Sequence, residues 1–188
     1  AEYSIQKRIV VPKRDMAQDF VNAVIATEDS EFYRHGGVDP KAIARAIITD
    51  VIERRKAQGA STLTQQLAKQ VFLTPDKTFR RKISEMFFAV QIEKDFTKDQ
   101  IFEFYANQVY LGHGAYGVEA ASRLYFGKHA KELTLPEAAV IAALIRSPMY
   151  YSPITHADRA KMRRDAFNLV DAARQAQERE AAKVAAGH

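Results

Sequence analysis

Apolar residues recur every three or four positions along most of this 188-residue chain, which places them on one face of an α-helix. Helix start signals accompany them: Asp39 and Pro40 form an N-cap followed by a first-turn proline, and Thr62 with Gln65 has capping-box spacing. These patterns predict helices over 16–28, 40–51, 62–71, 79–90, 97–111 (ended by a glycine at 112) and 134–146, and a basic amphipathic helix from about residue 157. The chain is therefore expected to be mainly α-helical.

The N-terminus follows a different pattern, because Ile5, Ile9 and Val11 alternate as in an extended segment. A short strand or hairpin is expected there, as the only β element. The chain shows no internal repeat and no linker, and its length suits one domain. Residues 1–188 are therefore predicted to form a single domain.

Composition excludes several classes of protein. With 47% apolar and 27% charged residues the chain is not intrinsically disordered, and without cysteine it has no disulfides, thiolate zinc site or cysteine nucleophile. Positive charge is concentrated between Glu53 and Lys82, where eight basic and two acidic residues give a local net charge of +6. Such a cluster indicates an anionic partner: a phosphate or pyrophosphate, an acidic membrane surface or nucleic acid.

An acidic pair, Glu28-Asp29, stands where an apolar helix meets a glycine-containing loop. A carboxylate that is partly desolvated at such a junction is suited to general-base catalysis. The alternative is an acidic helix end in water. His35 in the loop is more typical of a structural histidine, and no second histidine stands at metal-ligand spacing.

Three further segments carry polar side chains that suit a ligand site. The hydroxyls and amides of 59–70 cluster at a helix start, where they would hold phosphate or sugar oxygens or only cap the helix. Arg81 and Glu85 share a helix face, either beside a bound pyrophosphate or as an exposed ion pair. Asn107, before a loop with three glycines, is a cap or a sugar ligand.

Taken in this order, these segments resemble five motifs of the peptidoglycan glycosyltransferases, the family 51 transferases of bacterial cell-wall synthesis. The motifs span 28–153, about two-thirds of the chain, with a C-terminal helix or tail over 157–188. The residues that carry the resemblance are Glu28, Asp29, Phe32, His35 and Gly37; Gly59, Ser61, Thr62, Thr64, Gln65, Gln66 and Lys69; Arg81, Lys82, Glu85 and Ala89; Tyr105, Asn107, Gly112, Gly117, Tyr125 and Phe126; and Ala143, Pro148, Tyr151 and Pro153.

The resemblance implies a lysozyme-like, mainly helical domain that polymerises lipid II into β-1,4-linked glycan by inverting transfer, with release of undecaprenyl pyrophosphate. By position, Glu28 matches the general base that deprotonates the acceptor 4-hydroxyl, and Glu85 matches the second carboxylate. Asp29, Phe32 and His35 match supporting residues. The donor pyrophosphate site is expected to comprise Ser61, Thr62, Gln65, Gln66, Lys69, Arg81 and Lys82.

The implied partners are lipid II, the growing glycan chain, the membrane surface and moenomycin-type phosphoglycolipids, and not nucleic acid. No cofactor is required, although a divalent cation (Mg²⁺ or Mn²⁺) that bridges pyrophosphate and carboxylate is compatible with the chemistry. Family members act on the extracytoplasmic (periplasmic) face of the bacterial cytoplasmic membrane, tethered by an N-terminal helix that this chain is expected to lack.

Two features depart from the family pattern. Gln70 stands where the second motif usually has Asn, and Ala106 where the fourth has a larger apolar residue. Nothing after Pro153 supplies the Ser-x-x-Lys motif of a transpeptidase, so a monofunctional enzyme or an isolated domain is expected. The alternatives are a glycan-cleaving muramidase or lytic transglycosylase, which has no use for the cations, and a non-catalytic binder of anionic surfaces.

Overall fold

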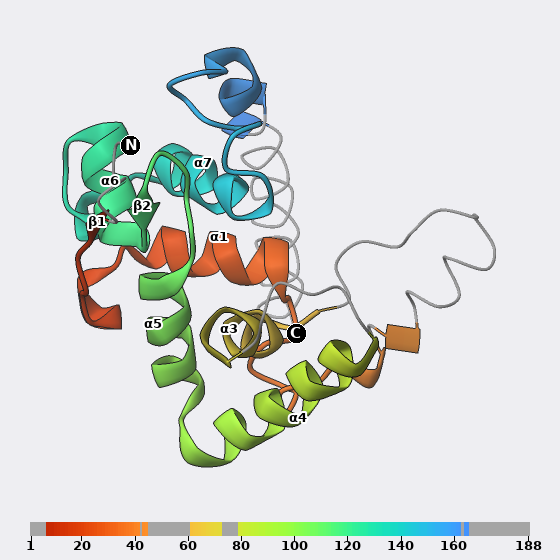
Figure 1. Ribbon diagram of the computed structural model, residues 1–188. Helices are drawn as coiled ribbons and strands as arrows, with labels where there is room; N and C mark the ends of the chain where they lie inside the picture. Colours follow the sequence, from red (N-terminus) through yellow and green to blue (C-terminus); the bar gives the residue numbers. More distant parts are fainter. Residues whose placement is uncertain (1–6, 42, 45–60, 73–78, 163, 166–188) are drawn as a thin grey trace, which may run out of the picture.

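The computed structural model describes residues 7–41, 43–44, 61–72, 79–162 and 164–165, and most of them are helical (Figure 1). The prediction of a mainly α-helical chain is therefore confirmed. The helices are α1 (Gln18–Glu28), α3 (Leu63–Phe72), α4 (Phe79–Asp95), α5 (Lys98–Gln108), α6 (Val118–Phe126) and α7 (Leu135–Arg146), with short 3₁₀ helices η1 (Lys13–Asp15) and η2 (Ala130–Glu132). Residues 40–41, 43–44, 157–162 and 164–165 are also helical.

The helices pack in two groups joined by α5. Helix α1 lies along α7, while α3 packs between α4 and α5 (Figure 1). Three fully buried rings hold the groups together, since Phe102 on α5 makes edge contacts with Phe20 on α1 (6.3 Å) and with Phe32 after α1 (6.5 Å). The apolar stripes predicted for α1, α3 and α5 are thus largely buried, as expected for amphipathic helices. The predicted stripe on α4 is different, because Ile83, Phe87 and Val90 are exposed.

The predicted capping boxes are present. At the start of α3, Thr62 Oγ1 accepts from Gln65 N–H (3.1 Å) and Gln65 Oε1 accepts from Thr62 N–H (3.0 Å). Thr97 and Gln100 form the same reciprocal pair at the start of α5. The predicted start of α7 is also confirmed.

Two helix predictions need correction. Helix α5 ends at Gln108 rather than at Gly112, because the chain becomes extended at Val109, whose carbonyl accepts from Gly117 N–H (2.8 Å). Helix α6 was not predicted, because it buries the polar side chains of Glu119 and Ser122 and so lacks a clean apolar stripe.

The N-terminal β element is a strand rather than a hairpin. Strand β1 (Lys7–Arg8) pairs in parallel with β2 (Ala115–Tyr116), far along the chain. Of the predicted helix over 40–51, residues 40–41 and 43–44 are helical, and 42 and 45–51 lie outside the described residues, as does the tail beyond residue 165. Among the described helices, none is long and apolar enough to cross a membrane.

Candidate active site

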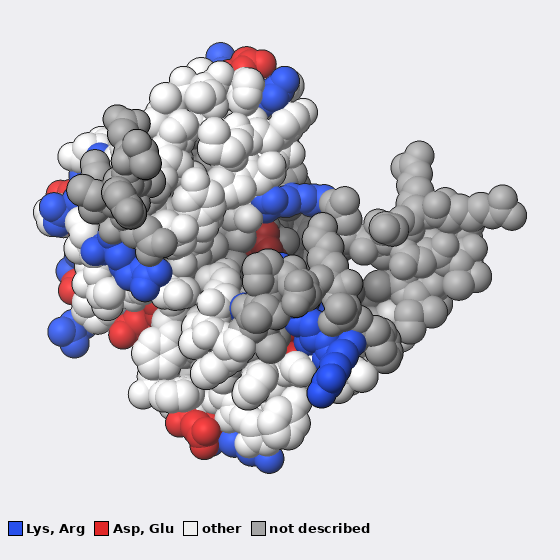
Figure 2. All heavy atoms as spheres, in the orientation of Figure 1, with Lys and Arg blue, Asp and Glu red and all other residues white. Residues whose placement is uncertain are grey.

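A cleft of about 480 Å³ opens between the end of α1, the outer face of α3, the first turns of α4 and the end of α7. In Figure 2, acidic atoms lie in a hollow near the centre of the face, with basic side chains above and below it. The cleft is lined by Thr27, Glu28, Ser61, Gln65, Gln66, Lys69, Arg81, Lys82, Glu85, Ile145 and Arg146. The structure therefore brings together eight of the residues that the sequence predicted for the site.

Glu28 is the last residue of α1 and is partly exposed to the cleft. Its Oε2 accepts a hydrogen bond from the Nε2 amide of Gln66 on α3 (3.0 Å). Its partner is a neutral amide, and no lysine or arginine of the described residues forms an ion pair with this carboxylate. That arrangement leaves Glu28 able to accept a proton from a ligand in the cleft.

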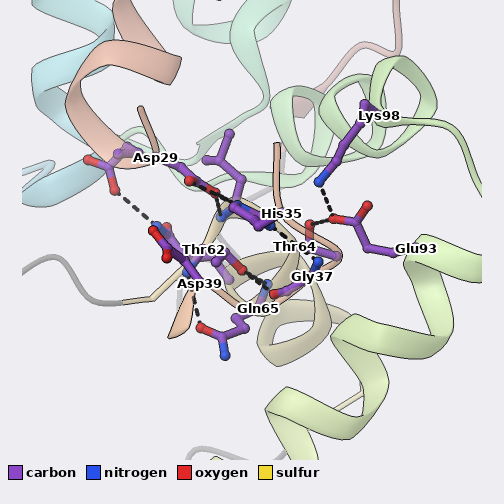
Figure 3. Close-up of polar contacts among 12 residues, drawn as sticks. Asp29, His35, Gly37, Asp39, Thr62, Thr64, Gln65, Glu93 and Lys98 are labelled. Atoms are coloured by element: carbon purple, nitrogen blue, oxygen red, sulfur yellow. Dashed lines mark hydrogen bonds and ion pairs between the residues drawn. The ribbon is translucent and has the colours of Figure 1, made fainter. Parts of the chain in front are cut away.

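Asp29 does not line the cleft, and its carboxylate joins the end of α1 to the start of α3 (Figure 3). Its carboxylate accepts from Leu63 N–H (2.9 Å) and lies within 2.9–3.0 Å of His35 Nε2. His35 Nδ1 accepts from Gly37 N–H (3.2 Å), so Nε2 carries the proton and donates to Asp29. Asp29 and His35 thus hold in place the backbone that follows Glu28.

A second set of contacts fixes the start of α3 against α4 (Figure 3). Thr64 donates to Glu93 Oε1 (2.6 Å), and Lys98 Nζ binds the same oxygen (2.7 Å). The ammonium of Lys98 also lies over the ring of Phe32, 4.6 Å from its centroid. Phe32 therefore supports the site from the core, through packing rather than through contact with the cleft.

Glu85 differs from Glu28, because cations bind both of its oxygens. Arg81 donates to Oε1, and Lys82 Nζ lies 2.7 Å from Oε2. Glu85 is only 3% exposed, so the two cations compensate its burial. Lys82 also donates to Ser61 Oγ (2.8 Å), which ties α4 to the residue before the α3 cap. Glu85 thus holds the Arg81 and Lys82 side chains in position in the cleft.

Charge in the cleft is unevenly distributed. The four cationic side chains of Lys69, Arg81, Lys82 and Arg146 share it with the two carboxylates of Glu28 and Glu85. At neutral pH the cleft lining therefore carries a net positive charge. Such a cleft favours a ligand that carries at least two negative charges, as a pyrophosphate does.

Several predicted residues do not line this cleft. Thr62 is 2% exposed and its hydroxyl donates to the Gly37 carbonyl (2.6 Å), so its oxygen is used within the fold. Asn107 does not line this cleft: its amide donates to the Val11 carbonyl (2.8 Å) and accepts from Val11 N–H (3.0 Å). It anchors the N-terminal segment and borders a separate apolar groove of about 400 Å³ between α3, α4 and α5.

The cleft also contains residues that the sequence did not single out, namely Thr27, Ile145 and Arg146. Arg146 stands in the last turn of α7, between the Ala143 and Pro148 of the fifth motif. The signal in the sequence that could have identified Arg146 was a basic residue between two residues of the fifth motif. It was missed because Arg146 lies far along the chain from the basic cluster over 53–82.

The carboxylates of the cleft do not form a set of metal ligands. In the described part of the chain, no group of three or more His, Asp and Glu side chains converges as metal ligands do. The two carboxylates of the cleft have protein partners already, the Gln66 amide and two cations.

Comparison with known proteins identifies the family. Residues 1–170 match the family model described as Transglycosylase. Three relatives are penicillin-binding protein 1F of Bacillus subtilis (48% identical over 160 residues), penicillin-binding protein 1A of Aquifex aeolicus (52% over 161) and penicillin-binding protein 1A of Escherichia coli (49% over 165). The matches cover 85%, 86% and 88% of this chain but only 22%, 22% and 19% of the relatives, so the chain spans about a fifth of their length.

These matches confirm the resemblance drawn from the five motifs and the enzyme class that it implied, a peptidoglycan glycosyltransferase. The chain belongs to the transglycosylase family.

Proposed function

We propose that this chain forms one domain that polymerises lipid II into β-1,4-linked glycan and releases undecaprenyl pyrophosphate. The observation that carries the proposal is the cleft itself, in which Glu28 faces a cluster of cations on α3, α4 and α7. A glycosyl transfer of this kind needs a base for the acceptor hydroxyl and positive charge for the departing pyrophosphate. Both requirements are present in the lining of one cavity.

Glu28 is the proposed general base. It takes the proton of the acceptor 4-hydroxyl as that oxygen attacks the donor's anomeric carbon. The bond from that carbon to the pyrophosphate breaks on the opposite face, and the configuration is inverted. The Gln66 amide, 3.0 Å from Glu28 Oε2, orients the carboxylate for this step.

Lys69, Arg81 and Lys82 are the proposed cations for the leaving group. A pyrophosphate carries its own negative charge, so fixed cations assist its departure without a strong general acid. Glu85 holds Arg81 and Lys82 in position from α4. Ser61, Gln65 and Gln66 line the same wall and would contact donor oxygens. A moenomycin-type phosphoglycolipid, which resembles the donor, should compete for this site.

The proposed partner surface is an anionic membrane, at the extracytoplasmic (periplasmic) face where a lipid-linked donor would be met. On α4, Ile83, Phe87 and Val90 are exposed apolar residues at three- and four-residue spacing, and therefore lie on one face. Arg80 and Lys94 stand on the same face at either end and are also exposed. Apolar side chains flanked by cations are typical of a surface that inserts among anionic headgroups.

The proposal is tested by incubation of the chain with fluorescent lipid II in detergent, with products resolved by gel. Wild type should produce a ladder of glycan chains, and Glu28→Gln should produce none while it melts at a similar temperature. A ladder from Glu28→Gln at the wild-type rate would refute the assignment of the base. Cleavage of preformed glycan without polymerisation would instead support a lytic enzyme.

A further inference from the structure

A chain of three hydrogen-bonded side chains leads from the core to Glu28. Tyr105 on α5 is fully buried, and its hydroxyl donates to Oε1 of Gln66 on α3 (3.0 Å). The Nε2 of the same Gln66 donates to Oε2 of Glu28 at the end of α1 (3.0 Å). Three helices thus contribute one residue each to a single path that ends on the carboxylate.

The hydrogen bonds run in one direction, from the Tyr105 phenol to the Glu28 carboxylate. This is so because the amide of Gln66 has one accepting and one donating end. Tyr105 donates to the carbonyl end, which leaves the NH₂ end turned toward Glu28. A flipped amide would place its carbonyl oxygen against the carboxylate and its NH₂ group against the phenol. Burial, together with the charges of Glu28 and Asp29, holds the pKa of Tyr105 well above its ordinary value, so the phenol remains a donor.

We propose that Tyr105 is a positioning residue for the transfer reaction: through Gln66, it holds the Glu28 carboxylate in the orientation that accepts the proton of the sugar hydroxyl. This inference rests on the proposed role of Glu28 as the base. Tyr105 itself does not line the cleft, so it acts without touching the substrate.

Loss of the phenol should affect the chemical step more than substrate binding. Without the Tyr105 hydroxyl, the carbonyl end of Gln66 loses its partner, and the amide no longer has one preferred direction. The Glu28 carboxylate would then be less well oriented toward the sugar hydroxyl, while the residues that bind the substrate stay in place.

The test is the measurement of kcat and KM for lipid II polymerisation by Tyr105→Phe. We expect kcat to fall about fivefold to tenfold, with KM changed less than about twofold. Tyr125→Phe is the matched control, because that partly buried phenol donates to the Leu111 carbonyl (2.7 Å), outside the cleft. The control should keep the wild-type kcat and KM.

A double-mutant cycle separates action through Gln66 from a general effect on the fold. Gln66→Ala should also lower kcat, and Tyr105→Phe should add no further loss of kcat to it. Additive losses in the double variant, or a Tyr105→Phe variant that raises KM without lowering kcat, would overturn the inference. An inactive wild type would instead count against the proposed function, so the two failures are distinguishable.

Discussion

The carboxylate of Asp29 accepts a hydrogen bond from the backbone N–H of Leu63 at 2.9 Å, and this bond joins the residue after α1 to the first residue of α3. The neighbouring Glu28 binds Gln66, one turn further along α3. Two adjacent carboxylates of one chain segment therefore accept hydrogen bonds from the same helix. Asp29 holds the start of α3 against the end of α1, and Glu28 lines the cleft beside them.

Asp29→Asn should lower both stability and activity. Its oxygens accept from Leu63 N–H and from His35 Nε2–H, and an Asn side chain would turn a donating NH₂ group toward one of these donors. We expect the free energy of unfolding to fall by about 1–3 kcal/mol and the polymerisation rate to fall at least tenfold in protein that is still folded. Urea unfolding and the lipid II assay measure the two effects. A folded variant with the wild-type rate would contradict the positioning role.

Lys69→Ala should weaken the donor site. Lys69 is exposed in the cleft, so its removal leaves the packing of α3 intact, and a loss of activity reflects lost charge. We expect at least a tenfold loss of kcat/KM, as for removal of a charge-assisted hydrogen bond of about 1.5–3 kcal/mol. Moenomycin affinity should fall in parallel.

Lys131→Ala is the control for that change. Lys131 is another exposed lysine, and it pairs only loosely with Asp15 (3.6 Å) on η1. Its replacement should alter neither kcat/KM nor moenomycin affinity. Equal, small effects of the two substitutions would show that Lys69 is an ordinary surface lysine.

Phe87→Glu should reduce membrane binding. Phe87 is 60% exposed at the centre of the apolar stripe on α4, so a charge there opposes insertion without disturbing the core. Co-sedimentation with phosphatidylglycerol vesicles should fall at least tenfold. Ile154→Glu is the matched control, since Ile154 is 58% exposed in the segment after α7, at the opposite end of the molecule from α4 (Figure 1). Equal losses in both variants would exclude a specific role for α4.

The sequence was informative about the fold wherever local signals agreed with packing. Helices α1, α3, α5 and α7 have both an apolar stripe and a start signal or boundary, and each was predicted. Helix α4 was also predicted, although its stripe of Ile83, Phe87 and Val90 is exposed. The exception, α6, buries the carboxylate of Glu119, whose partners come from Ala130 and other residues after the helix. No local pattern reveals that a buried polar residue will find partners later in the chain.

The site was predicted as a set of residues but not as an arrangement. Motif order identified Glu28 and the cations of α3 and α4, yet spacing could not show that Glu85 is bound by two cations while Glu28 is bound by an amide. Nor could it show that Asn107 serves the N-terminal segment. The contacts of Glu28 and Asn107 join residues far apart in sequence, which only the folded structure supplies. The Arg81–Glu85 pair is local and was foreseen from its spacing, but spacing did not show that Glu85 is buried.

Gly37→Ala should destabilise the loop beneath the cleft. Gly37 has φ +91°, a conformation that alanine rarely adopts, and an added Cβ would lie 2.7 Å from the Ala89 carbonyl oxygen on α4. We expect a loss of about 1–3 kcal/mol in the free energy of unfolding. The adjacent Gly36 has open space around its Cβ position, so Gly36→Ala should change stability by less than about 1 kcal/mol. Thermal and urea unfolding of the two variants would reveal the difference, and similar losses would contradict it.

Glu119→Gln should destabilise the protein in a pH-dependent manner. The Glu119 side chain is buried, which by itself raises its pKa, but the Ala130 N–H, Arg123 and His129 outweigh this and hold the pKa below the ordinary value of 4.5. A carboxyl whose pKa is lower in the folded state contributes stability above its unfolded pKa and loses it as pH falls through the folded value. We therefore expect Glu119→Gln to cost about 1–3 kcal/mol at pH 7.

The cost of Glu119→Gln should shrink as the pH is lowered below about 4.5, because the wild type then loses the same charge that the variant lacks. Urea unfolding of both proteins over a pH series measures this convergence. Glu132→Gln, at an exposed position on η2, should not reproduce it. A Glu119→Gln deficit that stayed constant from neutral to acid pH would mean that shape and hydrogen bonding, rather than charge, make this carboxylate stabilising.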